Sequence, residues 1–187
     1  MIVKVLNFIR ARLRKIILEE IWLEDYIKRG MKIGENCSIQ PRCIFDYSHC
    51  NLISIGNNVT LAPEVYLLAH DASTKYDLGY TKIGRIEIKD NVFIGARALI
   101  MPGVTVGKSS IIAAGAVVTK DVPSNSVVAG NPAKVICSKN EYINKNKLLL
   151  NEYPKFSWDY SHGSGKLTEE MKEEMNDKLK YTNGYMI

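Results

Sequence analysis

The 187-residue sequence contains no apolar run that approaches the roughly 18–20 residues needed to cross a membrane. It has no low-complexity block, and its 46% hydrophobic and 24% charged residues are typical of an ordinary folded protein. The net charge of +5 is too small to indicate a nucleic-acid-binding protein, although it would help to attract an anionic ligand. The apolar N-terminus is followed, not preceded, by its basic residues, so we expect no secretory signal.

The four cysteines lack the spacing of a metal site, and they do not suggest a disulfide framework. Cys37 and Cys43 lie six residues apart, in a slot that small residues occupy elsewhere in the chain, so we expect them to fill the core. Cys50 and Cys137 have no evident partner. The cysteine pattern therefore favours a reducing, cytoplasmic setting, and we expect no metal.

What the sequence does contain is a six-residue repeat between residues 88 and 122. This period fits neither an amphipathic helix nor an alternating strand. It predicts short flat strands joined by tight turns, three to a coil, with the coils stacked at about the 4.8 Å spacing of paired strands. The repeat places branched aliphatic residues at Ile88, Ile94, Ile100, Val106, Ile112 and Val118, and small or β-branched residues at Val92, Ala98, Val104, Ser110, Ala116 and Val122.

The repeat starts near Ile33 and is interrupted twice before residue 88. The first interruption, over residues 46–54, is short and rich in polar groups. The second follows Leu-Leu-Ala-His-Asp (67–71), where residues 72–87 leave the six-residue register. Insertions into a coiled repeat are tolerated at its corners and cluster on the binding face. A loop excursion over 72–87, directly after His70, is therefore a candidate functional site.

The two ends of the chain lack the repeat. Residues 2–28 show the three-to-four spacing of an amphipathic helix, which we expect to end before Gly30. Its basic first half leaves contact with a membrane surface open, although packing within the protein is favoured because its second half is acidic. We expect three parts: an N-terminal helical segment over 1–30, the repeat domain over 31–137, and a C-terminal extension over 138–187 with a short helix at 168–180 capped by Thr168.

Five stretches of the repeat resemble the hexapeptide-repeat acyltransferases. The resemblance covers roughly residues 31–137 and is closest to the branch of maltose, galactoside, xenobiotic and polysaccharide-building O-acetyltransferases. The matching stretches are Ile-Gly-Glu-Asn-Cys-Ser-Ile (33–39), Val-Phe-Ile-Gly-Ala (92–96), Met-Pro-Gly-Val-Thr-Val-Gly (101–107), Ala-Gly-Ala-Val-Val-Thr-Lys-Asp-Val-Pro (114–123) and Val-Ala-Gly-Asn-Pro-Ala-Lys (128–134).

This resemblance implies a mainly β protein, a left-handed parallel β-helix, with the helical segments as additions at its ends. It also implies a homotrimer with active sites in the clefts between subunits, and acetyl-CoA as the co-substrate lying along the coils. Closed symmetry is physically reasonable, because three prisms can bury flat faces against one another.

Acetyl transfer to a hydroxyl needs a base for the hydroxyl proton, and histidine suits this task near neutral pH. Of the three histidines, His70 stands where the family's catalytic histidine falls. A structural role is favoured for His49, and His162 lies in a segment that looks flexible. Asp71 is a candidate for orienting His70, but a carboxylate or carbonyl from elsewhere in the chain is at least as good a candidate, because neighbouring strand residues point to opposite faces.

The resemblance also assigns the coenzyme contacts. Ala96 and Ala114, 18 residues apart, match positions along the pantetheine arm, and Phe93 matches an aromatic residue beside the acetyl group. Thr119 and Lys120 match contacts at the far end of coenzyme A, and Lys134 matches a basic residue that faces its phosphates. In the excursion, Tyr76, Tyr80 and Asp71 are candidates for contacting the acceptor.

These observations leave other functions open. An N-acetyltransferase of amino sugars or antibiotics would share this fold, and so would a non-catalytic structural or binding β-helix. A zinc-dependent carbonic anhydrase is disfavoured, because it needs three converging histidines and only His49 and His70 lie within the repeat. The hypothesis that we carry forward is an acetyl-CoA-dependent O-acetyltransferase acting on a sugar or saccharide intermediate.

Overall fold

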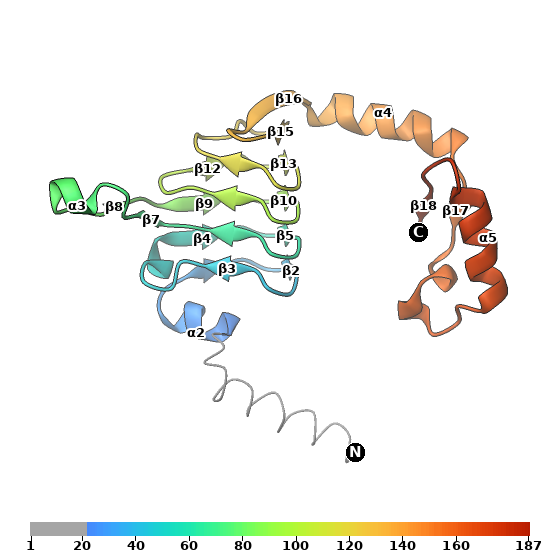
Figure 1. Cartoon of the computed structure of the whole chain (residues 1–187), viewed down its shortest axis with the longest axis horizontal. Helices are drawn as coiled ribbons and strands as arrows, with labels where there is room; N and C mark the ends of the chain where they lie inside the picture. The colour runs from blue at the N-terminus through green and yellow to red at the C-terminus, as the bar shows by residue number, and fades with distance from the viewer. Residues whose placement is uncertain (1–21) are drawn as a thin grey trace, which may run out of the picture. The chain divides into compact units, whose positions relative to one another are not determined.

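The computed structural model describes residues 22–187 (Figure 1). The chain divides into two compact units, one ending at Lys139 and one spanning Asn140–Ile187. Most of the helix expected over 2–28 lies outside the described residues, and the part that is described forms α2 (Leu23–Lys28). In residues 22–187, no helix has the length and apolar character that a membrane span requires.

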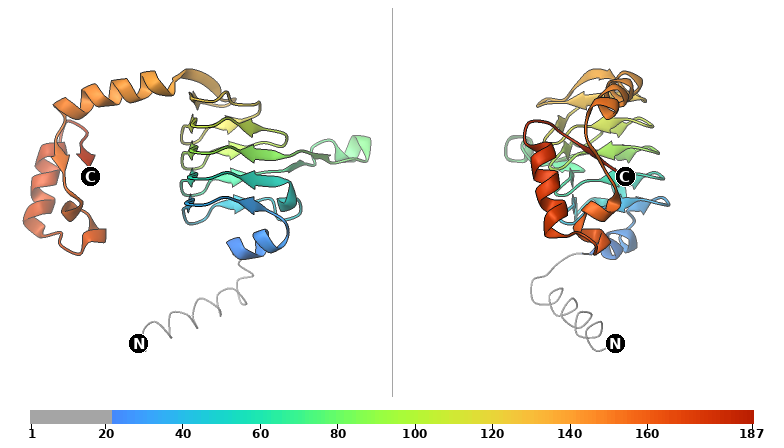
Figure 2. Two further views of the ribbon diagram at one scale, coloured as in Figure 1. Left: turned by 180° about the vertical axis from the view of Figure 1, so that it is seen from behind. Right: turned by 90° about the vertical axis from the view of Figure 1, so that its right-hand side faces the viewer.

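The first unit is a parallel β-helix in which the chain visits three faces in turn (Figure 2). Neighbouring strands on each face are parallel and in register, except that β15 and β16 are antiparallel. Face 1 contains β1 (Lys32–Ile33), β4 (Ile53–Ile55), β9 (Ile86–Ile88) and β12 (Thr105–Val106). Face 2 contains β2 (Ser38–Ile39), β5 (Thr60–Leu61), β10 (Phe93–Ile94), β13 (Ile111–Ile112), β15 (Ser126–Ala129) and β16 (Lys134–Ser138). Face 3 contains β3 (Ile44–Phe45), β6 (Tyr66–Leu67), β11 (Leu99–Ile100) and β14 (Val117–Val118).

The core of the β-helix consists of the residues that the six-residue repeat predicted to face inward. All twelve members of the two series between Ile88 and Val122 are buried. Full burial of each branched aliphatic side chain contributes about 1.5–3 kcal/mol, so the repeat alone supplies a large share of the stabilising energy. Cys37 and Cys43 pack against this core but are only partly buried. All four cysteines are free.

Tight turns form the corners of the prism. The first corner joins face 1 to face 2, the second joins face 2 to face 3, and the third joins face 3 to face 1. At the second corner, one residue in each coil adopts a positive φ, which restricts side chains but suits the turn. Coils also approach closely there: a Cβ on Gly95 would lie 2.5 Å from the backbone nitrogen of Ala114. The positive-φ residues of the second corner are Arg42, Glu64, Arg97 and Gly115.

The third corner departs from this regular pattern in two successive coils. In the first, the short helix η1 (Cys50–Leu52) precedes β4. In the second, a hairpin of β7 (His70–Asp71) and β8 (Lys82–Ile83) projects from the stack and has α3 (Lys75–Leu78) at its tip (Figure 1). The excursion expected over 72–87 is thus a hairpin whose first strand includes His70 itself.

The second unit holds two helices where the sequence predicted one. The predicted helix is α5 (Glu169–Leu179), and the hydroxyl of Thr168 caps it by accepting from the backbone of Met171 at 3.2 Å. The other helix, α4 (Lys139–Glu152), was missed because its apolar residues do not form a clear stripe at helical spacing. The remaining elements are β17 (Lys155–Phe156), η2 (Trp158–Tyr160), η3 (His162–Ser164) and β18 (Tyr185–Met186).

Candidate active site

The third corner contains a buried carboxylate, Asp46, which directly follows β3 and is only 2% exposed. Its Oδ1 accepts hydrogen bonds from the backbone nitrogens of Ser48 and His49, both at 3.1 Å. Its Oδ2 accepts from the backbone nitrogen of Ala69 at 3.0 Å and contacts Nδ1 of His70. Asp46 therefore connects the irregular turns of two successive coils.

Burial favours the neutral form of Asp46 and would raise its pKa. The hydrogen bond with His70, the backbone hydrogen bond from His49 and the attraction of both histidines outweigh this, so that the pKa of Asp46 lies below its ordinary value. The carboxylate is therefore ionised at neutral pH. An anionic acceptor next to Nδ1 favours the tautomer of His70 that donates from Nδ1 and keeps a free electron pair on Nε2.

His70 is well placed to act as a base. Its side chain is 34% exposed, so the ring is reachable although Asp46 behind it is buried. A histidine whose Nδ1 is fixed by a carboxylate has the arrangement of a general base that takes a proton at Nε2. The sequence identified His70 but not Asp46. The strand register was the missing signal, because Phe45 pairs with Leu67 and so aligns the residues that follow them.

His49 lies beside His70, a position that is compatible with the structural role that the sequence favoured for it. Its ring centroid lies 5.2 Å from that of His70, with 44° between the ring planes. Its Nδ1 lies 3.6 Å from Oδ1 of Asp46, is buried and has no hydrogen-bond partner among residues 22–187. His49 therefore lies against one side of the His70 ring.

Asp46, His49 and His70 lie close enough to hold a metal ion, with ligand atoms within 4.8 Å of one another. A carboxylate has about four lone-pair positions. Four hydrogen bonds to Asp46 already occupy these positions, three from backbone N–H groups and one from His70. A metal would have to displace some of them, so the donor set does not fit a metal centre.

The residues predicted to contact the acceptor lie on the hairpin that begins at His70. Asp71 accepts a hydrogen bond from the backbone nitrogen of Ser73 at 2.9 Å, which lowers the pKa of Asp71. It is Asp46, and not Asp71, that contacts the ring nitrogen of His70. Tyr76 and Tyr80 are 97% and 79% exposed, so their rings are open to solvent.

A second candidate region lies along the second corner, where a cavity of about 530 Å³ brings together Ala96 and Ala114. The backbone nitrogen of Gly115 donates to the carbonyl of Ala96 at 2.8 Å, which fixes these two turns together. Glu64 joins the neighbouring turns by ion pairs of 2.6 Å to both Arg42 and Arg97. The hydrogen bond from Arg97 is the main reason that the pKa of Glu64 is lowered. The small alanine side chains leave this corner open.

The other predicted coenzyme contacts do not line this cavity. Phe93 is 44% exposed on face 2, in the coil that contains Ala96. Thr119 and Lys120 are exposed at the third corner, directly after β14, and Lys134 is exposed at the start of β16. Within one chain, His70 and the alanine pair therefore occupy different corners of the prism.

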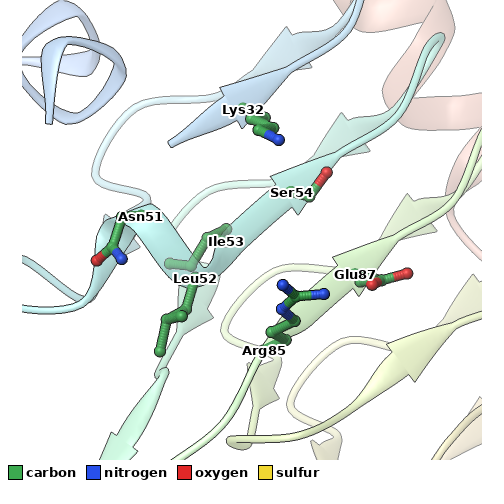
Figure 3. A pocket seen from close by; sticks show the side chains of 7 residues that line it. All are labelled: Lys32, Asn51, Leu52, Ile53, Ser54, Arg85 and Glu87. Carbon is green, nitrogen blue, oxygen red and sulfur yellow. The ribbon is translucent and has the colours of Figure 1, made fainter. Parts of the chain in front are cut away.

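A third candidate region is a cavity of about 160 Å³ that opens on face 1 beside the third corner (Figure 3). Side chains from β1, β4 and β9 and from the segments just before β4 and β9 surround it. Its lining residues are Lys32, Asn51, Leu52, Ile53, Ser54, Arg85 and Glu87. No sequence motif pointed to this cavity, because its residues come from three coils.

The stacked six-residue coils, with a carboxylate-oriented histidine at one corner, define the class of protein as a hexapeptide-repeat β-helix with a histidine-centred site. The family described as bacterial transferase hexapeptide (six repeats) matches residues 85–120. The chain is 36% identical over 131 residues to the putative acetyltransferase YvoF of Bacillus subtilis, covering 70% of this chain and 73% of the relative. It is 34% identical over 155 residues to the galactoside O-acetyltransferase of Lactococcus lactis, covering 67% and 74%.

A solved structure agrees with these relatives. The hexapeptide-repeat acetyltransferase VCA0836 of Vibrio cholerae, complexed with acetyl coenzyme A, is 26% identical, with a TM-score of 0.50 over 68% of this chain and 84% of that one. The chain belongs to the family of hexapeptide-repeat acetyltransferases, and it is an acyltransferase.

Proposed function

We propose that this protein is an acetyl-CoA-dependent O-acetyltransferase that transfers the acetyl group to a hydroxyl of a saccharide. The observation that carries this proposal is the pairing of His70 with the buried, ionised Asp46. The acetyl coenzyme A complex of VCA0836 and the galactoside O-acetyltransferase relative support the donor and the acceptor class.

In the proposed reaction, Nε2 of His70 takes the hydroxyl proton as the hydroxyl oxygen bonds to the thioester carbonyl carbon. The carbon–sulfur bond then breaks, and His70 returns the proton to the leaving thiolate. Asp46 is a positioning residue that stabilises the imidazolium formed between these steps. No covalent acyl-enzyme is required, which agrees with the partly or fully buried positions of Cys37, Cys43 and Cys50.

The second-corner cavity fits the pantetheine arm of coenzyme A. Larger side chains at Ala96 and Ala114 would fill the space that an extended arm needs. We assign Phe93 to the acetyl end, Thr119 and Lys120 to the far end of the coenzyme, and Lys134 to its phosphates. Lysine supplies charge at that position without the bidentate geometry of arginine.

His70 and the alanine cavity lie at different corners, so the complete site requires more than one chain. We propose a homotrimer in which the third corner of one copy faces the second corner of the next. Closed three-fold symmetry would form three identical clefts. Tyr76, Tyr80 and Asp71 of the projecting hairpin would form a wall of the acceptor site, since tyrosine rings pair apolar faces with hydroxyls.

The proposal is tested by incubating the protein with acetyl-CoA and a panel of sugar, amino-sugar and antibiotic acceptors. Thiol release measures turnover, and mass spectrometry identifies the product. We expect an ester that mild alkali removes. An alkali-stable product formed only with amines would replace this proposal with an N-acetyltransferase. A protein that neither binds nor consumes acetyl-CoA would point to a non-catalytic β-helix.

A further inference from the structure

The small cavity on face 1 is connected through the backbone to the residues around the proposed base (Figure 3). Arg85 follows Gly84, whose backbone nitrogen donates to the carbonyl of Ala69 at 3.0 Å, and Ala69 immediately precedes His70. On the other side, Asn51 lies two residues after His49, whose ring packs beside that of His70. Two lining segments of the cavity therefore extend from the third corner.

The cavity has an excess of positive charge. Lys32 and Arg85 are exposed, and within residues 22–187 neither has a carboxylate within 4.0 Å. Glu87 also lines the cavity, but Nζ of Lys89 neutralises it at 2.5 Å. That hydrogen bond is the main reason that the pKa of Glu87 is lowered. Arg85 also attracts Glu87 electrostatically, but Lys32 and Arg85 together outnumber this one lining carboxylate.

The polar groups here come from aligned strands. Lys32, Ser54 and Glu87 are in register on β1, β4 and β9, so their side chains follow one another across face 1. In Figure 3, the guanidinium of Arg85 points toward the space below Lys32 and Ser54. The cavity therefore combines two cations with a hydroxyl from Ser54 and an amide from Asn51.

Size indicates what this cavity accepts. Its volume of about 160 Å³ equals that of about five water molecules at about 30 Å³ each. Pockets for whole ligands usually exceed about 300 Å³. The space suits one charged substituent, such as a carboxylate or phosphate, and not a complete saccharide. Arginine binds both groups with a fork of two donors, and lysine adds a point charge.

We propose that this cavity is an acceptor subsite for an anionic group, so that the preferred acceptor is a saccharide with a carboxylate or phosphate. This inference rests on the proposed acetyltransferase function, because it places the anion beside the base that activates the acceptor hydroxyl. The anion is held by Lys32 and Arg85, with Asn51 and Ser54 as hydrogen-bond donors.

The test compares matched neutral and anionic probes. Lactobionate and lactitol differ at one carbon, which is a carboxylate in the first and an alcohol in the second. Galactose 1-phosphate and methyl α-galactoside form the corresponding phosphate pair. Binding is measured by calorimetry without acetyl-CoA, and kcat/KM for acetyl transfer is measured separately.

We expect at least one anionic probe to bind about tenfold more tightly than its neutral partner, as for hydrogen bonds to a charged group. Lys32→Gln and Arg85→Gln should each remove most of this preference and leave the neutral probes unchanged. Lys147→Gln, which replaces an exposed lysine of α4, is the charge-matched control and should have no effect. The probe pair that shows the preference indicates whether the subsite binds a carboxylate or a phosphate.

The two hypotheses fail in different ways. Equal binding within both pairs, or a preference that survives both substitutions, would overturn the anionic subsite whatever the enzyme does. Anion binding that Lys32→Gln and Arg85→Gln abolish, in a protein that acetylates no acceptor, would overturn the proposed function and keep the subsite.

Discussion

The second and third corners of the β-helix are built from the same six-residue coils but differ in regularity. At the second corner each described coil turns with one positive-φ residue, and the turns stack into a continuous surface over Ala96 and Ala114. At the third corner two coils are extended, by η1 and by the β7–β8 hairpin. Stacking of regular turns produces an open groove, whereas the extensions bring Asp46, His49 and His70 together.

This difference has a physical origin. A tight turn uses its backbone groups to bond neighbouring coils and leaves little room for reactive side chains. An extended turn has backbone donors to spare, and at the third corner three of them hold Asp46 ionised in a buried position. Catalysis is therefore expected to depend on the third corner, and binding of the pantetheine arm of coenzyme A on the second. Four substitutions test this division.

The largest effect is expected for His70→Ala at the third corner. Loss of a general base should lower kcat by about 10²–10⁴-fold, because the substitution removes the group proposed to accept the hydroxyl proton. Acetyl-CoA affinity and the thermal unfolding midpoint should change little, since the ring is partly exposed. His162→Ala in the second unit is the matched control. Retained turnover in His70→Ala would remove His70 as the base.

Asp46→Asn should have the next largest effect, a fall in kcat/KM of about 10²-fold. The asparagine amide can donate to Nδ1 of His70 and so stabilise the tautomer that carries its hydrogen on Nε2, as in histidine–carboxylate sites generally. The pH at which kcat/KM is half-maximal should also move, which a purely structural role would not cause. Asp71→Asn is the control, and an equal loss in that variant would contradict the assignment of Asp46.

The lowered pKa of Asp46 also predicts that the stability of the folded protein depends on pH. Its folded-state pKa is lowered, so its stabilising contribution is present above the ordinary carboxyl pKa of about 3.9 and is lost as the pH falls through the lowered value. The difference in unfolding free energy between the wild type and Asp46→Asn should be constant near pH 7 and shrink below about pH 4. Denaturant titrations at several pH values measure it. A difference that grew as the pH fell below about 4 would contradict the lowered pKa of Asp46.

A smaller effect is expected when the second corner is blocked. Ala114→Leu should raise KM for acetyl-CoA about tenfold with little change in kcat, because it removes space for binding without touching the base. Lys108→Leu, at the equivalent turn position of the same coil at the first corner, is the control. A change confined to kcat would argue against a coenzyme groove at the second corner.

The smallest effect is expected for Lys134→Glu, which places a negative charge where the coenzyme phosphates are proposed to lie. Coenzyme A affinity should fall several-fold at low salt and less at high salt, since Lys134 is exposed and its field is screened. Lys147→Glu on α4 is the control. Unchanged affinity at low salt would remove Lys134 from the site.

Much of the fold followed from the sequence because the repeat is a local packing pattern. Each residue of the two six-residue series between Ile88 and Val122 faces the core of its own coil, so its role could be deduced without knowing its distant neighbours. The helix α5 was predicted for the same reason, from its cap and apolar stripe. The helix α4 lacks such a stripe and was therefore not predicted.

The sequence by itself determined the coil, its interruptions and the choice of His70 among three histidines. The tertiary structure alone decided what surrounds His70. Parallel stacking places Phe45 beside Leu67, and this register brings Asp46 to a histidine 24 positions later. The same stacking gathers Lys32, Ser54 and Arg85 from separate coils. Which residues of neighbouring coils come into contact depends on the number of residues in each turn. The six-residue repeat does not give this number for the two extended turns of the third corner.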